Sequence, residues 1–177
     1  RSGSTYRSAG ITKSGYLYPG SAVTFYPSTV DLLDFGLNDS ASIVIVGRQH
    51  GTSASYGGWI TKGTNTDTNG WSIFNPSTNA SLYSNGAYAP NYTDHVLFTS
   101  TSLLNRSNAT STMYTNTTAG TAATSVTINF NNIGSTLKIG SFQTNLYSDI
   151  EVVSAAIFRR VLTSNEIALI TNYFNRR

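Results

Sequence analysis

Two carboxylates near the end of the chain, Asp149 and Glu151, form the best-placed pair for acid–base chemistry. They stand two residues apart, so they would share one face of a strand. Glycoside hydrolysis needs two such groups, one as the acid and one as the nucleophile or base. No further acid follows in the same segment, and the next one, Glu166, is better suited to a helix cap. We therefore predict a polar strand start here and no enzymatic activity.

The chain has two histidines, His50 and His95, which lie far apart in the sequence. Neither has a partner at the spacing of an H-x-x-x-H metal site, and there is no cysteine. The G-x-S-x-G pattern of a nucleophilic serine is absent too. We expect both imidazoles to be structural or surface groups, although a Ser-His-Asp arrangement stays open in a chain so rich in serine.

Oxygen-bearing side chains alternate in the segment NTDTNG at 65–70, which ends in glycine. This spacing resembles the first half of a calcium-binding loop, in which alternate side chains point at a hard cation. Pro76 stands where such a loop places its bidentate glutamate. Two interpretations follow: a calcium site with Asp67 and Asn69 as ligands, or a hairpin loop of Asx turns with no cofactor, which the missing glutamate favours.

Aromatic and amide side chains gather in three loop regions that could hold a sugar, at 56–59, 83–92 and 145–147. A sugar has apolar faces and a polar rim, so a ring platform flanked by hydrogen-bonding amides would suit it. The candidate glycan-binding residues are Tyr56, Trp59, Tyr88, Asn91 and Tyr92. Trp59 is also compatible with packing in the core, and a tyrosine-rich loop would equally suit a protein interface.

Charged residues make up only 11% of the 177-residue chain, and the net charge is +3. The basic residues concentrate near the two ends and form no run that would predict nucleic-acid binding. No apolar stretch is long enough to cross a membrane. The chain opens on Arg1, as expected of a processed product or a fragment. Abundant Ser, Thr and Asn without cysteine favour an extracellular, cell-surface or virion-surface location.

Short apolar runs separated by clusters of Gly, Asn, Pro and Ser predict an antiparallel all-β sandwich or barrel. No helical segments lie between the runs, which excludes a parallel βαβ arrangement. Residues 1–20 are poor in apolar side chains and should form an extended N-terminal arm, followed by one domain over 21–177. The predicted strands cover 42–47, 59–63, 71–74, 80–83, 95–100, 110–115, 124–130, 136–140 and 150–158.

The segment 150–158 is apolar on both alternating faces, so we predict that it is the most buried strand. Strict alternation places Ile150, Val152, Ala156 and Phe158 on one face and Val153, Ala155 and Ile157 on the other.

A capped amphipathic helix should follow this strand at once. Thr163 is placed as the N-cap, and Glu166 at the third helical position completes a capping box. Leu162 and Ile167 have the spacing of a hydrophobic staple. The helix should lie flat on the sandwich and close one of its edges or ends. Its predicted apolar stripe is Ile167, Ile170, Tyr173 and Phe174.

The segment IFRRVLTSNEI at 157–167 resembles the C-terminal signature of concanavalin A-like and laminin-G-like jelly-roll domains, the lectin and glucanase superfamily. Segments 59–63, 70–73, 113–116 and 137–140 look like further strands of that family in the same order. Ser154 and Asp94 stand where the family has an acidic and an aromatic residue. The Glu-x-Asp-x-x-Glu motif of hydrolases with this fold is absent.

The resemblance implies an antiparallel jelly-roll β-sandwich with one short C-terminal amphipathic helix. The predicted function is a non-catalytic, surface-exposed, lectin-like module that binds a glycan or surface polysaccharide or serves in adhesion. The alternative is a structural coat or decoration subunit of a virion, fibre or filament. In that case residues 1–20 would mediate assembly with other chains, without ligand binding.

Overall fold

The computed structural model describes part of the chain in detail. The described residues are 10–11, 17–18, 23–25, 33, 35–36, 38–50, 57–62, 71–75, 79–82, 87–93, 95–126, 136–141 and 148–176. Side chains are described for these except before residue 33 and at 75, 79–82 and 87–90.

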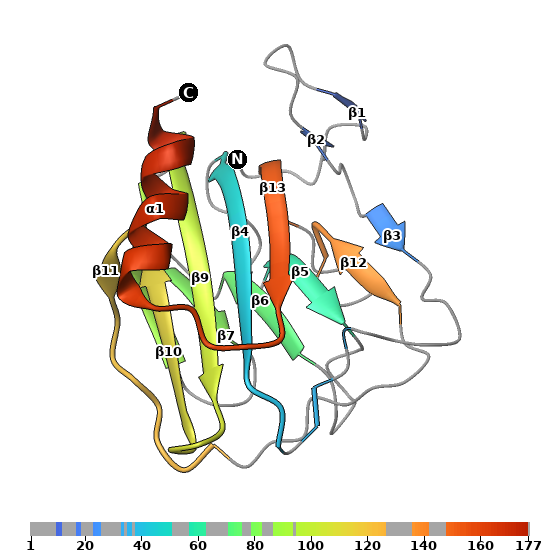
Figure 1. The fold of residues 1–177 in the computed structure, drawn as a ribbon. Helices are drawn as coiled ribbons and strands as arrows, with labels where there is room; N and C mark the ends of the chain where they lie inside the picture. The colour runs from blue at the N-terminus through green and yellow to red at the C-terminus, as the bar shows by residue number, and fades with distance from the viewer. Residues whose placement is uncertain are drawn as a thin grey trace.

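Among these residues, the strands form two antiparallel sheets that face each other, as Figure 1 shows. The seven-stranded sheet has the order β1 (Gly10–Ile11), β2 (Leu17–Tyr18), β13 (Ile150–Phe158), β4 (Ala41–Gln49), β9 (Leu97–Asn105), β10 (Thr110–Thr115) and β11 (Thr118–Ala119). The six-stranded sheet has the order β3 (Val23–Phe25), β12 (Leu137–Ile139), β5 (Gly57–Lys62), β6 (Trp71–Asn75), β7 (Asn79–Leu82) and β8 (Ala87–Asn91). The single helix of the described residues, α1 (Ser164–Asn175), lies on the outer face of the seven-stranded sheet. The predicted jelly-roll sandwich with one C-terminal helix is confirmed.

Most of the predicted runs form strands, with three differences, and the short strands β1, β2, β3 and β11 were not predicted. β9 continues to Asn105, because residues 101–105 still pair with β10 and residues 101–104 also pair with β4. β8 forms inside the segment 84–94, which its Pro and Asn residues made look like a loop. It is the last strand of its sheet, where proline is tolerated because an edge N–H needs no partner. Residues 124–126 belong to no strand, and 127–130 lie outside the described residues.

β4 is the centre of the seven-stranded sheet and is buried along almost its whole length. Ile43 and Ile45 point between the sheets into the main core, whereas Val44 and Val46 point outward under α1. Because both faces are covered, this strand reads as a continuous apolar run. Burial of a valine or isoleucine contributes about 1.5–3 kcal/mol relative to exposure, so β4 anchors both layers.

The prediction that the strand over 150–158 is the most buried one is wrong. β13 is buried only at its first three residues, and Ala155 is exposed. Among the described residues, only the two-residue strands β2 and β1 continue the sheet beyond β13. β4 and β9 take the buried central place instead.

A β-bulge in β13 also changes which residues share a face. The register shifts between Val152 and Ser154, so one extra residue is inserted relative to β4. Ile150 and Val152 face the inter-sheet core as predicted, but after the bulge Ile157 faces that core while Phe158 packs on the helix side. The predicted grouping of Phe158 with Ile150 is therefore wrong, because strict alternation holds only for an unbulged strand.

The helix begins as the sequence predicted. Thr163 is the N-cap, its side chain accepts from the Glu166 N–H at 3.3 Å, and Glu166 Oε2 accepts from the Thr163 N–H at 2.8 Å. Leu162 and Ile167 are buried together in the cluster beneath the helix. The helix covers the outer sheet face rather than an edge or end of the sandwich. Tyr173 is 53% exposed, and Thr171 takes the buried place on the stripe.

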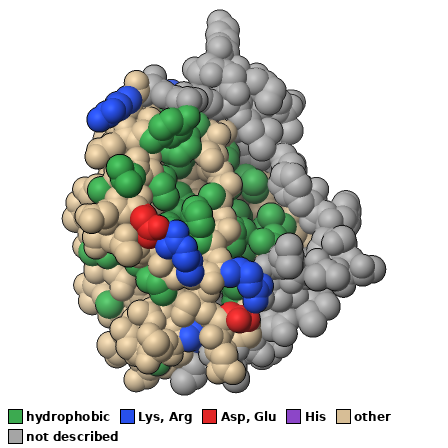
Figure 2. All heavy atoms as spheres, in the orientation of Figure 1, with side chains coloured by type: hydrophobic (Ala, Val, Ile, Leu, Met, Phe, Trp, Pro, Cys, Tyr) green, Lys and Arg blue, Asp and Glu red, His purple; other side chains and the backbone are tan. Residues whose placement is uncertain are grey.

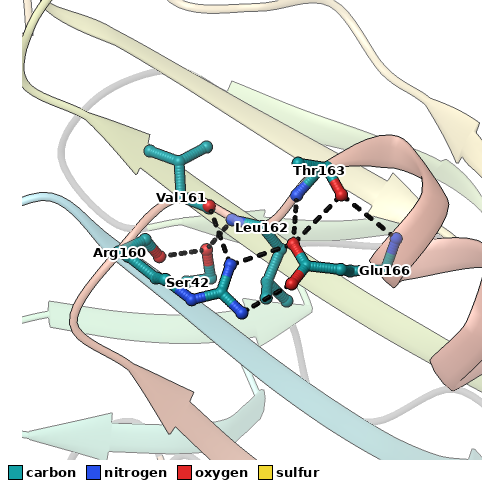
Figure 3. A network of polar contacts seen from close by, with 6 residues as sticks. All are labelled: Ser42, Arg160, Val161, Leu162, Thr163 and Glu166. Carbon is teal, nitrogen blue, oxygen red and sulfur yellow. Dashed lines mark hydrogen bonds and ion pairs between the residues drawn. The ribbon is translucent and has the colours of Figure 1, made fainter.

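Residues around the helix start form a polar network that we call the C-terminal clasp: Ser42, Arg160, Leu162, Thr163 and Glu166 (Figure 3). Arg160 makes two contacts with the Glu166 carboxylate, at 2.9 and 2.6 Å. The Ser42 hydroxyl donates to the Arg160 carbonyl at 2.7 Å and accepts from the Leu162 N–H at 2.9 Å. The hydrogen bonds from Arg160 and Thr163 lower the pKa of Glu166 to about 2. The clasp thus ties the helix start to β4.

The face that carries α1 shows grouped hydrophobic side chains with acidic and basic groups beside one another (Figure 2). The ion pairs Arg159–Asp39 and Arg160–Glu166 span 3.1 and 2.6 Å. Leu169, on the helix, is 70% exposed. Elsewhere, between the sheets, an apolar cavity of about 370 Å³ is lined by Leu33, Ile60, Leu137, Ile139, Ala155 and Ile157.

Candidate functional site

Chain segments that are distant in sequence meet at one end of the sandwich. β4 ends there at Gln49, β9 and β13 begin there, and the residues after β8 cross between the sheets. We call this the histidine end, because His50 and His95 lie on it. In Figure 1 it is the end at which the β4 arrow finishes.

An aromatic cluster supports the histidine end from within. Tyr92 stacks on Phe98, with ring centroids 4.9 Å apart, and meets the edge of Trp59 at 5.2 Å. The Trp59 side chain is fully buried, and its indole N–H donates to the Gln49 side-chain oxygen at 3.0 Å. Ring pairs of this kind contribute about 0.5–1.5 kcal/mol beyond the area that they bury. Tyr92 is therefore held in a fixed position.

The sequence-predicted glycan residues have different places in the structure. Asn91 is exposed, and Tyr92 beside it is half-buried on the aromatic cluster. Trp59 lies in the core, as the packing interpretation held, so its ring supports the site rather than facing solvent. Tyr88 belongs to β8, where only the backbone is described. Tyr56 and the candidate calcium ligands Asp67 and Asn69 lie outside the described residues.

Four ionisable side chains converge at the histidine end. The Glu151 carboxylate is 3.6 Å from the Arg48 guanidinium and 3.4 Å from Nε2 of His50. Nδ1 of His50 is in turn 3.1 Å from Nδ1 of His95. Among the described side chains, no group of three His, Cys, Asp or Glu is arranged to hold a metal ion. Asp149 contributes its backbone carbonyl, which accepts from the His50 N–H at 2.7 Å.

Sequence reasoning missed the contact between the two histidines because 45 positions separate them. A signal for it does exist. His50 follows the end of one apolar strand, and His95 precedes the start of the next long one. Antiparallel pairing of these two strands brings the end of the first against the beginning of the second. The pairing of β4 with β9, however, is set by the whole sheet and not by local spacing.

No family model and no curated protein matches the sequence. Solved structures do resemble the fold. The binding domain of Paraclostridial Mosquitocidal Protein 1 matches 97% of this chain at 13% identity, with a TM-score of 0.67. A Ruminococcus gnavus IT-sialidase CBM40 bound to α2,3-sialyllactose matches 83% at 11% identity, with a TM-score of 0.62. Trypanosoma rangeli sialidase matches 78% at 12% identity, with a TM-score of 0.58.

These similarities support the antiparallel β-sandwich fold. The match covers 98% of the CBM40 chain but only 46% of the mosquitocidal binding domain and 23% of the sialidase. In the part of the chain that the structure describes, no helix is both long and apolar enough to cross a bilayer.

Proposed function

We propose that this chain is a non-catalytic, lectin-like module that binds a glycan at the histidine end, on the surface of a cell, virion or fibre. The observation that carries the proposal is the exposed Asn91 beside Tyr92, whose ring is braced by Phe98 and Trp59. A braced ring loses little conformational freedom on binding, which favours affinity. The CBM40 similarity supports the same class of function, because the match covers 98% of that domain and 83% of this chain.

The chemistry of the histidine end suits a glycan that carries a negative charge. Asn91 offers an amide that can both donate and accept hydrogen bonds to sugar hydroxyls. Arg48, His50 and His95 bring a guanidinium and two imidazoles to the same end, where the buried Glu151 carboxylate lies 3.6 Å from Arg48. A sialylated or otherwise acidic glycan therefore fits the proposal better than a neutral one.

The absence of catalysis is part of the proposal. The Glu151 carboxylate is 9% exposed and lies between Arg48 and His50, so it is committed to an ion-pair network. Glu166 is committed to the C-terminal clasp. Hydrolysis requires two carboxyl groups on either side of one glycosidic bond. The structure places these two glutamates in separate polar networks.

A glycan array with acidic and neutral sugars tests this proposal, followed by calorimetric titration of any ligand found. We expect binding to an acidic glycan that Asn91→Ala weakens about 10-fold or more, because a lost hydrogen bond to a bound sugar costs roughly 1.5 kcal/mol. The matched control is Asn108→Ala, in the β9–β10 turn at the other end of the sandwich, which should leave the affinity unchanged.

Failure of the folded protein to bind any glycan on the array, with and without calcium, would contradict the proposal. Equal weakening by Asn91→Ala and Asn108→Ala would place the site elsewhere. Incubation of the bound glycan with the protein checks the non-catalytic part: release of free sugar would show an enzyme.

The alternative proposal is a structural subunit in which residues 1–20 mediate assembly. Two short strands from this segment, β1 and β2, pair with each other, and β2 pairs with β13 of the same chain. Deletion of residues 1–20 should abolish self-assembly, measured by light scattering, while the remaining domain still melts cooperatively. Assembly that survives the deletion would rule this alternative out.

A further inference from the structure

The contact between His50 and His95 has the dimensions of a metal-binding pair. Two imidazole nitrogens bound to one ion lie about 2.0–2.1 Å from it, so they stand roughly 2.9 Å apart at a right angle and 3.3 Å apart at a tetrahedral angle. The two Nδ1 atoms are 3.1 Å apart, within that interval. The ring centroids are 5.2 Å apart with the planes tilted by 54°. The separation of the two nitrogens is therefore compatible with one ion that binds both.

The buried carboxylate of Glu151 acts on the other nitrogen of His50. Its Oε2 atom lies 3.4 Å from Nε2, and neither atom has a hydrogen-bond partner among the described residues. A carboxylate at that place favours the hydrogen on Nε2 and leaves the Nδ1 lone pair directed at His95. Metal-binding histidines are usually held by such a carboxylate through the nitrogen that does not bind the metal.

The backbone holds both imidazoles in place before any ion arrives. The His50 N–H donates to the Asp149 carbonyl and the His95 N–H to the Gln49 carbonyl, each at 2.7 Å. His95 has a φ of 64°, in the left-handed region that few non-glycine residues adopt. A strained backbone of this kind costs about 1–3 kcal/mol and is concentrated at functional sites.

We propose that His50 and His95 bind one divalent transition-metal ion through their Nδ1 atoms, with Glu151 as the positioning residue for His50. Imidazole nitrogen selects borderline ions such as Zn²⁺, Ni²⁺ and Cu²⁺ over Mg²⁺ and Ca²⁺. No third His, Cys, Asp or Glu of the described residues completes the site. Water fills the remaining coordination positions, on the exposed His95 side.

The sequence makes this site unusually easy to test. The whole chain contains two histidines and no cysteine, so no other imidazole or thiolate competes for the ion. Untagged protein is titrated with Zn²⁺, Ni²⁺ and Cu²⁺ by calorimetry, with Mg²⁺ as the ion that should not bind. We expect one ion per chain, with Cu²⁺ the tightest, in the general order of affinity for nitrogen ligands. Imidazole ¹⁵N spectra should show both Nδ1 resonances, and neither Nε2 resonance, shifting strongly with Zn²⁺.

Three substitutions separate metal binding from a structural role. His95→Asn should abolish the one-to-one binding, and asparagine tolerates a positive φ, so the fold should be retained. Glu151→Gln should weaken the affinity about 10- to 100-fold, the usual effect of losing a group that orients a ligand. The control is Asp39→Asn, which also removes one negative charge. Asp39 precedes the start of β4, far from the histidine end, so this variant should leave the metal affinity unchanged.

Saturable one-to-one binding with this pattern of variants supports the site. Binding that His95→Asn leaves intact, or ions that shift the Nε2 resonances instead, would overturn it. So would a spectrum that keeps a hydrogen bond between the two imidazoles at saturating Zn²⁺, because the contact would then be an imidazole–imidazole hydrogen bond only. The spectra of the unsubstituted protein decide this even if a variant fails to fold. The inference is independent of whether a glycan binds.

Discussion

The C-terminal clasp and the histidine end are both polar networks attached to β4, yet they were unequally visible in the sequence. In the clasp, Thr163 and Glu166 are three positions apart and satisfy each other's backbone groups. At the histidine end, the two imidazoles that touch are separated by 45 positions. A capping box can be read from local spacing alone. A contact between the ends of two strands can be read only once their pairing is known.

The two networks also differ in what holds them. The clasp is exposed at Arg160 and Glu166 and depends mainly on hydrogen bonds. The histidine end rests on buried rings, with Trp59 and Phe98 beneath Tyr92. Damage to the clasp should therefore remain local, whereas damage to the aromatic cluster should spread to the groups above it.

The largest effect is expected for Trp59→Ala. Removing this buried ring should lower the free energy of unfolding by about 3–5 kcal/mol, because a cavity remains in the core. It also removes the edge contact with Tyr92 and the hydrogen bond to Gln49. Chemical denaturation measures the first effect, and imidazole chemical shifts of His50 and His95 report the second. A small loss with unchanged histidine signals would contradict the supporting role of this ring.

A smaller effect is expected for Thr163→Ala in the clasp. Loss of an N-cap side chain typically costs about 1 kcal/mol, with a range of roughly 0.5–2. Denaturant unfolding gives the value, and amide hydrogen exchange should show faster exchange confined to the first turn of α1. The His50–His95 contact should keep its signals. If these signals change, the clasp and the histidine end are coupled, and damage to the clasp does not remain local.

A change of pH should alter the stability that the clasp contributes by less than the substitution Thr163→Ala does. The folded-state pKa of Glu166 is lowered to about 2 from an ordinary value of 4.5 by its hydrogen bonds to Arg160 and Thr163. Because the folded-state pKa is the lower one, the ionised Glu166 stabilises the fold above pH 4.5. This contribution to the stability is lost as the pH falls from 4.5 toward 2. The difference in melting temperature between the unsubstituted protein and Glu166→Gln should therefore shrink over that interval. A difference that stays constant with pH would show that the carboxylate charge is not involved.

The smallest effect is expected for Leu169→Ser on the outer face of α1. This side chain is 70% exposed, so its loss should change the free energy of unfolding by less than about 0.5 kcal/mol. Leucine also favours helix slightly more than serine, which sets the expected sign as destabilising. Thermal unfolding measures the loss of stability in Leu169→Ser, and Thr163→Ala measured in parallel shows how large that loss is in comparison. A loss larger than that of the cap variant would mean that the helix face is covered by another surface in solution.

The features that the sequence predicted correctly are those set by interactions between residues close together in the chain. The apolar run of β4 and the capping box at Thr163 were both visible, because burial period and backbone capping act within a few residues. The faces of β13 were not, because the bulge after Val152 arises from its pairing with β4. For the site, Asn91 and Tyr92 could be named from their residue types. Their place at the same end of the sandwich as His95 and His50 could not, because it depends on the sheet order.

The Ser42 hydroxyl, which joins β4 to Leu162 across 120 positions, has a consequence for how the chain folds. The strands on both sides of β4 come from much later in the sequence, so its hydrogen bonds remain open until those residues are available. Closing such distant contacts costs chain entropy before any burial is gained, so sandwiches of this type fold in roughly milliseconds to seconds. During this time the apolar run of β4 is unpaired on both edges. Folding of this chain is therefore the stage at which it is most exposed to aggregation, and the arrival of β13 and α1 ends that exposure.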